Sequence, residues 1–155
     1  MLYLPVLWVE RLIAQGKCPK NTAVISFYDP AIKRIDKNYT HVDYSGVCDE
    51  KNVHFSELED LDIDVLGERG CPPESYFSDE SVSNMAKCIM KAYDDDMEII
   101  CQCEYGQSRS AACAAAILEH FYNRGISIFA DYKYCPNKLI YNKLLDKLDN
   151  PEPKK

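Results

Sequence analysis

Apolar and polar positions follow two different periods along this chain. Short β-branched or continuous apolar runs predict strands at residues 1–4, 22–28, 41–44, 52–58 and 97–103. Apolar residues at helical spacing predict helices between these strands, at about 5–15, 79–93, 109–124 and 137–148. Strands that alternate with helices are typical of α/β proteins, so we expect an α/β layer architecture.

The ends of the predicted helices carry recognisable signals. Pro5 suits the first position of the first helix, and Gly16 is expected to end it. Ser78 and Asn137 are the expected N-caps of the second and last helices, because their side chains can accept hydrogen bonds from exposed backbone N–H groups. Gly125 is expected to end the helix that precedes it.

Residues 59–78 follow neither period. The segment is acidic and contains Gly67, Gly70 and the pair Pro72-Pro73. We therefore expect a long loop, and loops of this length inside a small domain are usually functional or disordered.

Length and charge limit what the chain can be. Its 155 residues fit a single domain, which we place at residues 1–149, with a disordered tail at 150–155. The formal net charge of −7 opposes binding to nucleic acid or an anionic membrane, since both need a basic surface. An anionic substrate would therefore need a local positive site. The apolar start, 1–9, is too short for a membrane segment and lacks the flanks of a signal peptide, so a cytoplasmic protein is expected.

The chain has eight cysteines, and their spacing supports neither a disulfide framework nor a metal site. No Cys-x-x-Cys pair is present. Cytoplasmic cysteines are usually reduced, and Cys88 and Cys113 lie among apolar residues. We therefore expect reduced, mostly structural cysteines, no metal and no cofactor.

One segment departs from that structural interpretation. It lies between a predicted strand and an Ala-rich helix and reads Cys103-Glu104-Tyr105-Gly106-Gln107-Ser108-Arg109-Ser110. The backbone N–H groups of a tight loop at a helix N-terminus form a cradle for anions. Arg109 adds a planar fork of donors that matches phosphate oxygens, and Gly106 lets the backbone curl without a Cβ in the way. The segment thus supplies the local positive site that the acidic chain otherwise lacks.

The same cradle favours a thiolate at Cys103. A thiolate that faces a bound phosphate can attack it in line and form a phosphocysteine. Ser110 can donate a hydrogen bond to the sulfur when the sulfur becomes a leaving group. A Cys and an Arg at this spacing also occur by chance as structural residues. Chance does not readily add the glycine, the two serines, the strand before and the helix after, so we predict an active site.

The Cys-x5-Arg-Ser pattern resembles the signature loop of the protein tyrosine phosphatase superfamily. Its Cys-x-x-Gly-x-Ser-Arg-Ser form is most similar to the dual-specificity branch and to small bacterial tyrosine-phosphatase-like proteins. The resemblance is strong over residues 98–122 and weaker over 23–30 and 135–145. It implies a central, twisted, mainly parallel sheet with helices on both faces.

The resemblance also implies roles for single residues. Cys103 would be the nucleophile, Arg109 would clamp the phosphate and the transition state, and Ser110 would assist breakdown of the intermediate. Phosphate, sulfate or vanadate would occupy the loop, held by the backbone of Glu104, Tyr105, Gly106, Gln107, Ser108 and Arg109.

Gln102 departs from the family pattern, which usually has His immediately before the nucleophile. A glutamine can still hydrogen-bond the loop but cannot carry charge. Slower turnover, or the loss of activity altogether, is therefore predicted.

A phosphatase of this kind needs an acid for the leaving oxygen, usually an Asp on a loop that closes over the site. The segment Leu58-Glu59-Asp60-Leu61-Asp62 is similar to the apolar–acid–Asp–apolar–Asp pattern of related small bacterial phosphatases. Asp60 is the first candidate, Asp62 the second and Asp64 the third. Acidic loops are also often simply solvated.

The resemblance implies a phosphorylated protein or a small phosphomonoester as substrate. Phosphoinositide phosphatases of the superfamily tend to carry Lys in this loop, whereas Glu104 and Tyr105 add no positive charge, so highly charged lipid headgroups are disfavoured. Two other classes stay open. Gln102 suggests a phosphate-binding pseudo-phosphatase, which should tolerate loss of Cys103. The Cys-Glu-aromatic opening suggests a rhodanese-like or arsenate-reductase-like enzyme, which thiosulfate or arsenate would reveal.

Overall fold

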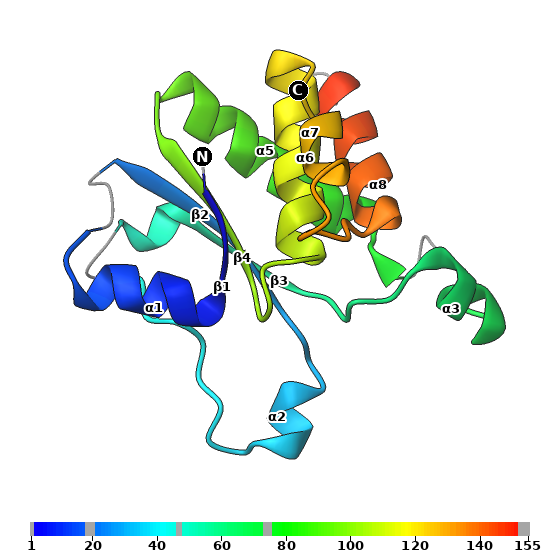
Figure 1. Cartoon of the computed structure of the whole chain (residues 1–155), viewed down its shortest axis with the longest axis horizontal. Coiled ribbons are helices and arrows are strands. Elements are labelled where there is room, and N and C mark those ends of the chain that lie inside the picture. The colour runs from blue at the N-terminus through cyan, green and yellow to red at the C-terminus, as the bar shows by residue number, and fades with distance from the viewer. Residues whose placement is uncertain (1, 18–20, 46–47, 73–75, 152–155) are drawn as a thin grey trace.

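The computed structural model describes residues 2–17, 21–45, 48–72 and 76–151 (Figure 1). Its regular elements are β1 (Leu2–Pro5), α1 (Val6–Ala14), β2 (Thr22–Tyr28), α2 (Ile32–Ile35), η1 (Glu50–Asn52), β3 (Val53–Glu57), α3 (Ile63–Glu68), α5 (Asp79–Asp94), β4 (Glu98–Cys103), α6 (Arg109–Tyr122), α7 (Ile126–Phe129) and α8 (Lys138–Asp149). The expected α/β architecture is confirmed.

The strands form a four-stranded sheet in the order β1-β4-β2-β3, and every pair is parallel. Ile25 of β2, for example, lies opposite Cys101 of β4. Parallel strands place their carboxyl ends at one edge of the sheet, which is where α/β proteins usually bind ligands. β2, β3 and β4 therefore end side by side, at Tyr28, Glu57 and Cys103.

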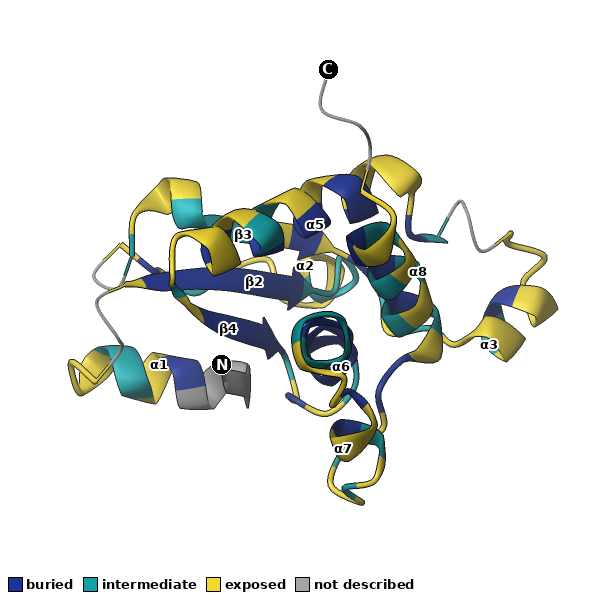
Figure 2. Ribbon diagram, turned by 90° about the horizontal axis from the view of Figure 1, so that it is seen from above, coloured by how far each residue is buried: buried dark blue, intermediate teal, exposed yellow. Residues whose placement is uncertain are grey.

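The sheet is covered on both faces, which explains why β2 is a continuous apolar run rather than an alternating one. Ile25, Cys101 and Cys103 belong to the large core that the sheet forms with α5, α6, α7 and α8. Val24 and Ile100 point the other way, into a smaller cluster with Val9 of α1 and with Tyr44. Figure 2 shows α1 on the opposite side of the sheet from α5.

Helix α6 packs closely because its inner residues are small. The run from Ala111 to Ala116 is completely buried. The helix ends at Asn123, which adopts a left-handed conformation with φ of 52°, so the prediction that Gly125 ends it is wrong. Gly125 is needed for another reason: a Cβ there would lie 2.6 Å from the backbone oxygen of Ala115.

Two further expectations about elements need correction. Residues 41–44 form no strand, because Tyr44 packs on the face of the sheet instead of pairing at its edge. The predicted loop at 59–78 contains the short helix α3, which Asp62 caps by accepting from the backbone N–H of Val65 at 2.9 Å. The four-residue helix α2 was not anticipated.

Pro5 is the last residue of β1 and not the first of α1, which begins at Val6, so that prediction is wrong. The following boundaries agree with the sequence patterns. The strands predicted at 22–28, 52–58 and 97–103 correspond to β2, β3 and β4. Ser78 and Asn137 are the N-caps of α5 and α8, as predicted. Of the tail predicted at 150–155, residues 152–155 lie outside the described residues. No helix in the described part of the chain has the length and apolar character needed to cross a bilayer.

Candidate active site

The signature loop, residues 103–110, joins the end of β4 to the start of α6. Cys103 is the last residue of β4 and Arg109 the first residue of α6. Gly106 has a φ of 71°, which a side chain would disfavour, and its backbone N–H points back to the Cys103 Sγ at 3.3 Å. The loop therefore curls around the sulfur, with the N-terminus of a fourteen-residue helix behind it.

Cys103 and Ser110 form the buried floor of the loop. Cys103 is 2% exposed and Ser110 is fully buried. The Ser110 Oγ lies 3.2 Å from the Cys103 Sγ. A sulfur that faces both a hydroxyl and a backbone N–H is well placed to carry negative charge, because both groups can donate to it.

Arg109 is buried in spite of its charge, with 3% of its side chain exposed. One terminal nitrogen, Nη1, donates to the backbone oxygen of Leu58 at 2.6 Å, and the other, Nη2, pairs with Glu104. The Nε has no hydrogen-bond partner in the described part of the chain. Leaving a buried donor unpaired costs about 1–3 kcal/mol, so such an atom calls for a functional explanation.

The structure brings one of the three candidate acids to the loop. The Asp60 Oδ1 accepts from the Ser108 Oγ at 2.7 Å, and its Oδ2 lies 3.9 Å from the Arg109 Nε. Asp62 is instead the cap of α3, and Asp64 is exposed in the first turn of that helix. Of the three candidates, Asp60 is therefore the one that contacts the loop, and its role as the acid stays a prediction.

Asn137, expected only as a helix cap, and Tyr76, which was not anticipated, hold the Asp60 segment in place. Asn137 caps α8 through its side-chain oxygen and donates through Nδ2 to the Asp60 Oδ1 at 3.2 Å and the Leu61 oxygen at 2.7 Å. The Tyr76 hydroxyl donates to the Glu59 backbone oxygen and accepts from the Leu61 N–H at 3.1 Å. Burial raises the pKa of Tyr76 to about 12, so this hydroxyl stays protonated.

Gln102 lies on the face of the sheet opposite to Cys103. Its side-chain oxygen accepts from the Ser26 Oγ at 2.5 Å and from the Tyr44 hydroxyl at 3.0 Å. These bonds join β4 to β2 and to the 41–44 segment. The Gln102 side-chain oxygen therefore bonds to residues on the α1 face of the sheet and not to the signature loop.

The side chains of the loop differ in direction. Tyr105 is 79% exposed, and Gln107 is also exposed while its backbone oxygen accepts from the Cys135 N–H at 3.0 Å. Glu104 turns inward and is 14% exposed. None of these side chains adds positive charge, so Arg109 and the backbone N–H groups supply whatever attraction the loop has for an anion.

The described cysteines carry no disulfide. Behind the loop, the Cys101 Sγ lies 3.6 Å from the Cys113 Sγ, and both thiols are fully buried. Burial raises the pKa of the Cys113 thiol, which fits a packing role. Among the described residues, no group of three or more His, Cys, Asp or Glu side chains is arranged to hold a metal ion.

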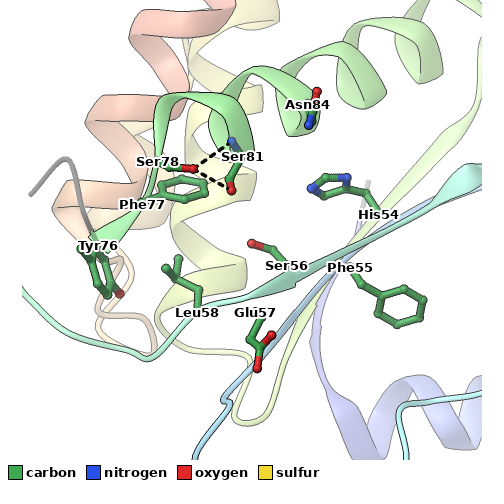
Figure 3. Close-up of a pocket in the computed structure, with 10 residues that line it drawn as sticks. All are labelled: His54, Phe55, Ser56, Glu57, Leu58, Tyr76, Phe77, Ser78, Ser81 and Asn84. Carbon is green, nitrogen blue, oxygen red and sulfur yellow. Dashed lines mark hydrogen bonds between the residues drawn. The ribbon is translucent and has the colours of Figure 1, made fainter.

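A pocket of about 410 Å³ lies beside the signature loop rather than in it. It runs between β3 and the start of α5, from His54 to Leu58 on one side and from Tyr76 to Asn84 on the other (Figure 3). It contains neither Cys103 nor Arg109. Two residues at one end of the pocket also contact the site. The Leu58 backbone oxygen accepts from Arg109, and the Tyr76 hydroxyl donates to the Glu59 backbone oxygen, next to Asp60.

Comparison with known proteins places this geometry in a known fold. No protein-family model and no curated protein matches the sequence. Solved structures do match: human tyrosine phosphatase-like serine/threonine/tyrosine-interacting protein has a TM-score of 0.57 at 12% identity, covering 94% of this chain and 86% of that one. A mouse putative dual specificity phosphatase complexed with zinc tungstate has a TM-score of 0.52 at 14% identity, covering 91% and 76%. PTPMT1 in complex with PI(5)P has a TM-score of 0.51 at 14% identity, covering 95% and 87%.

These likenesses establish the fold. The chain has the architecture of tyrosine and dual-specificity phosphatases, a parallel sheet flanked by helices. The resemblance stated from the residues of the signature loop is thereby confirmed at the level of fold.

Proposed function

We propose that this protein is a cysteine-dependent phosphomonoester hydrolase of the tyrosine or dual-specificity phosphatase type. The observation that carries the proposal is the Arg109 Nε, a buried donor without a partner in the described part of the chain. It lies in a loop that also holds a buried thiol and a helix N-terminus. A phosphate oxygen would satisfy this donor, and the backbone N–H groups of residues 104–109 would bind the other oxygens.

The residues suggest a reaction in two steps. In the first, the Cys103 thiolate attacks phosphorus, a sulfur–phosphorus bond forms, and the bond to the leaving oxygen breaks while Asp60 donates its proton to that oxygen. In the second, Asp60 takes a proton from water, the water oxygen attacks phosphorus, and the sulfur leaves as a thiolate. The Ser110 hydroxyl, 3.2 Å from the sulfur, stabilises that thiolate. Arg109 binds the phosphoryl oxygens throughout.

The proposed substrate is a phosphorylated protein or a small phosphomonoester. The mouse neighbour was solved as a complex with zinc tungstate, and tungstate, like phosphate, is a tetrahedral oxyanion, which is consistent with the proposed binding of an oxyanion by this protein. The PTPMT1 neighbour was solved with PI(5)P, an inositol lipid. In this chain residues 104–108 include no Lys or Arg and do include Glu104, which favours a substrate with one phosphate group over a polyphosphorylated headgroup.

A phosphate-binding pseudo-phosphatase is the second candidate. The observation that favours it is Gln102, whose side-chain oxygen bonds to Ser26 and Tyr44 and carries no charge beside the nucleophile. The proposal of an enzyme is preferred because the thiol, the arginine, the serine and the candidate acid all meet at the loop.

The test is hydrolysis of a small aryl phosphate by the purified chain across pH, under reducing conditions. We expect turnover by the parent and none by Cys103→Ser or Arg109→Ala. A parent that binds vanadate but does not hydrolyse the substrate would be the pseudo-phosphatase instead. Turnover that survives Cys103→Ser would contradict the thiolate mechanism.

A further inference from the structure

The side chain of Glu104 makes contacts that the two-step mechanism above does not use. Glu104 follows Cys103 in a loop whose Tyr105 and Gln107 side chains are exposed. The side chain of Glu104 itself is only 14% exposed. Its Oε2 pairs with the Arg109 Nη2, and its Oε1 accepts from the Asp29 backbone N–H at 2.8 Å. One carboxylate therefore joins the start of α6 to the end of β2 across the mouth of the loop.

We propose that Glu104 is the positioning residue for Arg109, the group that turns its guanidinium so that Nε faces the bound phosphate. This inference rests on the proposed function. In the proposed mechanism only the backbone of Glu104 binds phosphate. The further role belongs to its side chain, which sets the orientation of the Arg109 guanidinium.

The contacts of the guanidinium support this role. The Leu58 oxygen holds Nη1 and Glu104 holds Nη2, so two anchors fix the plane of the group. Nε is left unpaired among the described residues and faces the side on which the Asp60 Oδ2 lies, at 3.9 Å. Without Glu104 only the Leu58 oxygen would remain as a close anchor, and the guanidinium could turn about that single bond.

The burial of the pair distinguishes it from an ordinary surface ion pair. Arg109 is 3% exposed and Glu104 is 14% exposed, whereas the Arg69–Glu59 pair on the surface is 55% and 35% exposed. Exposed pairs contribute little, but removal of one partner of a buried pair leaves the other charge desolvated and free to seek new contacts. Loss of Glu104 should therefore change the orientation of Arg109, not only the local charge.

Charge and geometry predict opposite effects, which makes the role testable. Glu104 places a negative charge beside an anion site, so its removal alone would strengthen the binding of phosphate in the ground state. Positioning of the arginine matters most for the transition state, where charge on the transferred phosphoryl group is redistributed. The proposal predicts that kcat falls while KM does not rise.

The experiment compares the parent with Glu104→Gln, Glu104→Ala and Glu104→Asp in hydrolysis of an aryl phosphate. We expect kcat to fall about 10- to 100-fold in Glu104→Gln and further in Glu104→Ala, with KM unchanged or lower. Glu104→Asp keeps the charge and should recover part of the lost kcat. Glu57→Gln is the matched control, because Glu57 also ends a strand at this edge of the sheet but contacts Tyr28 instead of Arg109; its kcat should stay at the parental value.

Two results would overturn the proposal. A higher kcat/KM in Glu104→Gln would show that the carboxylate only inhibits the arginine. An unchanged kcat in Glu104→Gln and Glu104→Ala, together with lower thermal stability, would show a purely structural ion pair.

If the parent itself gives no turnover that depends on Cys103, the proposed function is wrong, and the positioning role needs a test that does not depend on turnover. Protection of Cys103 from alkylation by vanadate, whose five-coordinate adduct resembles the transition state, then tests the positioning role, which predicts weaker protection in Glu104→Ala than in the parent and is contradicted by equal protection.

Discussion

At the scale of single residues, the chemistry depends on which groups face the Cys103 Sγ and the oxygen that leaves. Ser110 and the Gly106 N–H lie within hydrogen-bond reach of the sulfur. Asp60 lies on the other side of the loop, bound by Ser108 and near the Arg109 Nε. Changes at Ser110 should therefore affect the second step, in which the sulfur leaves, whereas changes at Asp60 should affect both steps.

Asp60→Asn removes the proposed acid while keeping the size of the side chain. We expect kcat to fall about 10²- to 10⁴-fold, and the alkaline limb of the pH profile, which reports loss of the acid's proton, to disappear. Asp62→Asn is the matched control, because Asp62 caps α3 and, within the described part of the chain, forms no hydrogen bond or ion pair with the signature loop. Loss of the alkaline limb in Asp62→Asn rather than in Asp60→Asn would contradict the assignment.

Ser110→Ala removes the hydroxyl beside the sulfur. A hydrogen bond to a charged group contributes about 1.5–3 kcal/mol, so breakdown of the phosphocysteine should slow about 10- to 100-fold. A rapid-quench experiment should then show a burst of released alcohol followed by slow turnover. A variant without a burst and with parental kcat would show that the serine has no such role.

The sequence indicated the candidate residues of the signature loop and, through the family resemblance, Asp60, but it did not indicate the long-range contacts that hold them. Cys103, Arg109 and Ser110 lie within eight positions, so strand, loop and helix could be predicted together with their chemistry. The contact of Asn137 with Asp60 spans 77 positions, and that of Arg109 with the Leu58 oxygen spans 51. Such contacts have no local pattern, because they arise from the order of strands in the sheet.

At the scale of elements, α8 both stabilises the fold and holds the site through its cap, Asn137. The side-chain oxygen caps the helix and the side-chain nitrogen holds Asp60 and Leu61. These two functions of one side chain can be separated, because aspartate caps a helix as well as asparagine does but has no N–H to donate.

Asn137→Asp should therefore keep the cap of α8 but lower kcat, since Asp60 loses a donor and gains a like charge beside it; at this buried position the same like charge also lowers the free energy of unfolding. Ser78→Ala is the converse control: it should cost about 1 kcal/mol of stability through the cap of α5 and leave kcat unchanged. Denaturant unfolding and turnover, measured on both variants, check the pair. Equal kcat in Asn137→Asp and the parent would contradict a role for Asn137 at the site.

Elements were predicted best where the apolar pattern was long or where the strand is covered on both faces of the sheet. β2 was predicted with its observed bounds, Thr22–Tyr28, because a strand covered on both faces reads as one apolar run. The prediction of a strand at 41–44 was wrong because Tyr44 is buried against the face of the sheet but is not part of a strand. The helix α3 is six residues long and buries only Leu66, which is too little to produce a helical period in the sequence.

At the scale of the whole molecule, stability should depend on pH through His54 of β3, whose ring nitrogen Nδ1 lies 3.8 Å from the Cys88 Sγ of α5. Burial lowers the pKa of His54 below its ordinary 6.5. The folded state then binds fewer protons than the unfolded state near that pH, so stability is fully present above pH 6.5 and falls as the pH drops through 6.5 toward the lower, folded-state value. His54→Gln should remove this part of the pH dependence.

Urea unfolding of the parent and of His54→Gln, at neutral pH and at a pH below 6.5, checks this prediction. The parent should lose more stability than the variant on acidification, because the carboxylates titrate alike in both. An equal loss in the two proteins would contradict a neutral, half-buried His54 in the fold.

The central claim is that Cys103 carries the phosphoryl group during turnover. The most direct measurement is the intact mass of the Ser110→Ala chain, quenched in acid while it hydrolyses an aryl phosphate, beside the same chain with Cys103→Ser added. We expect one added phosphoryl group, located on Cys103 by fragmentation, and none in the double variant. Turnover with no phosphoryl group on Cys103, or with the group on another residue, would contradict the mechanism.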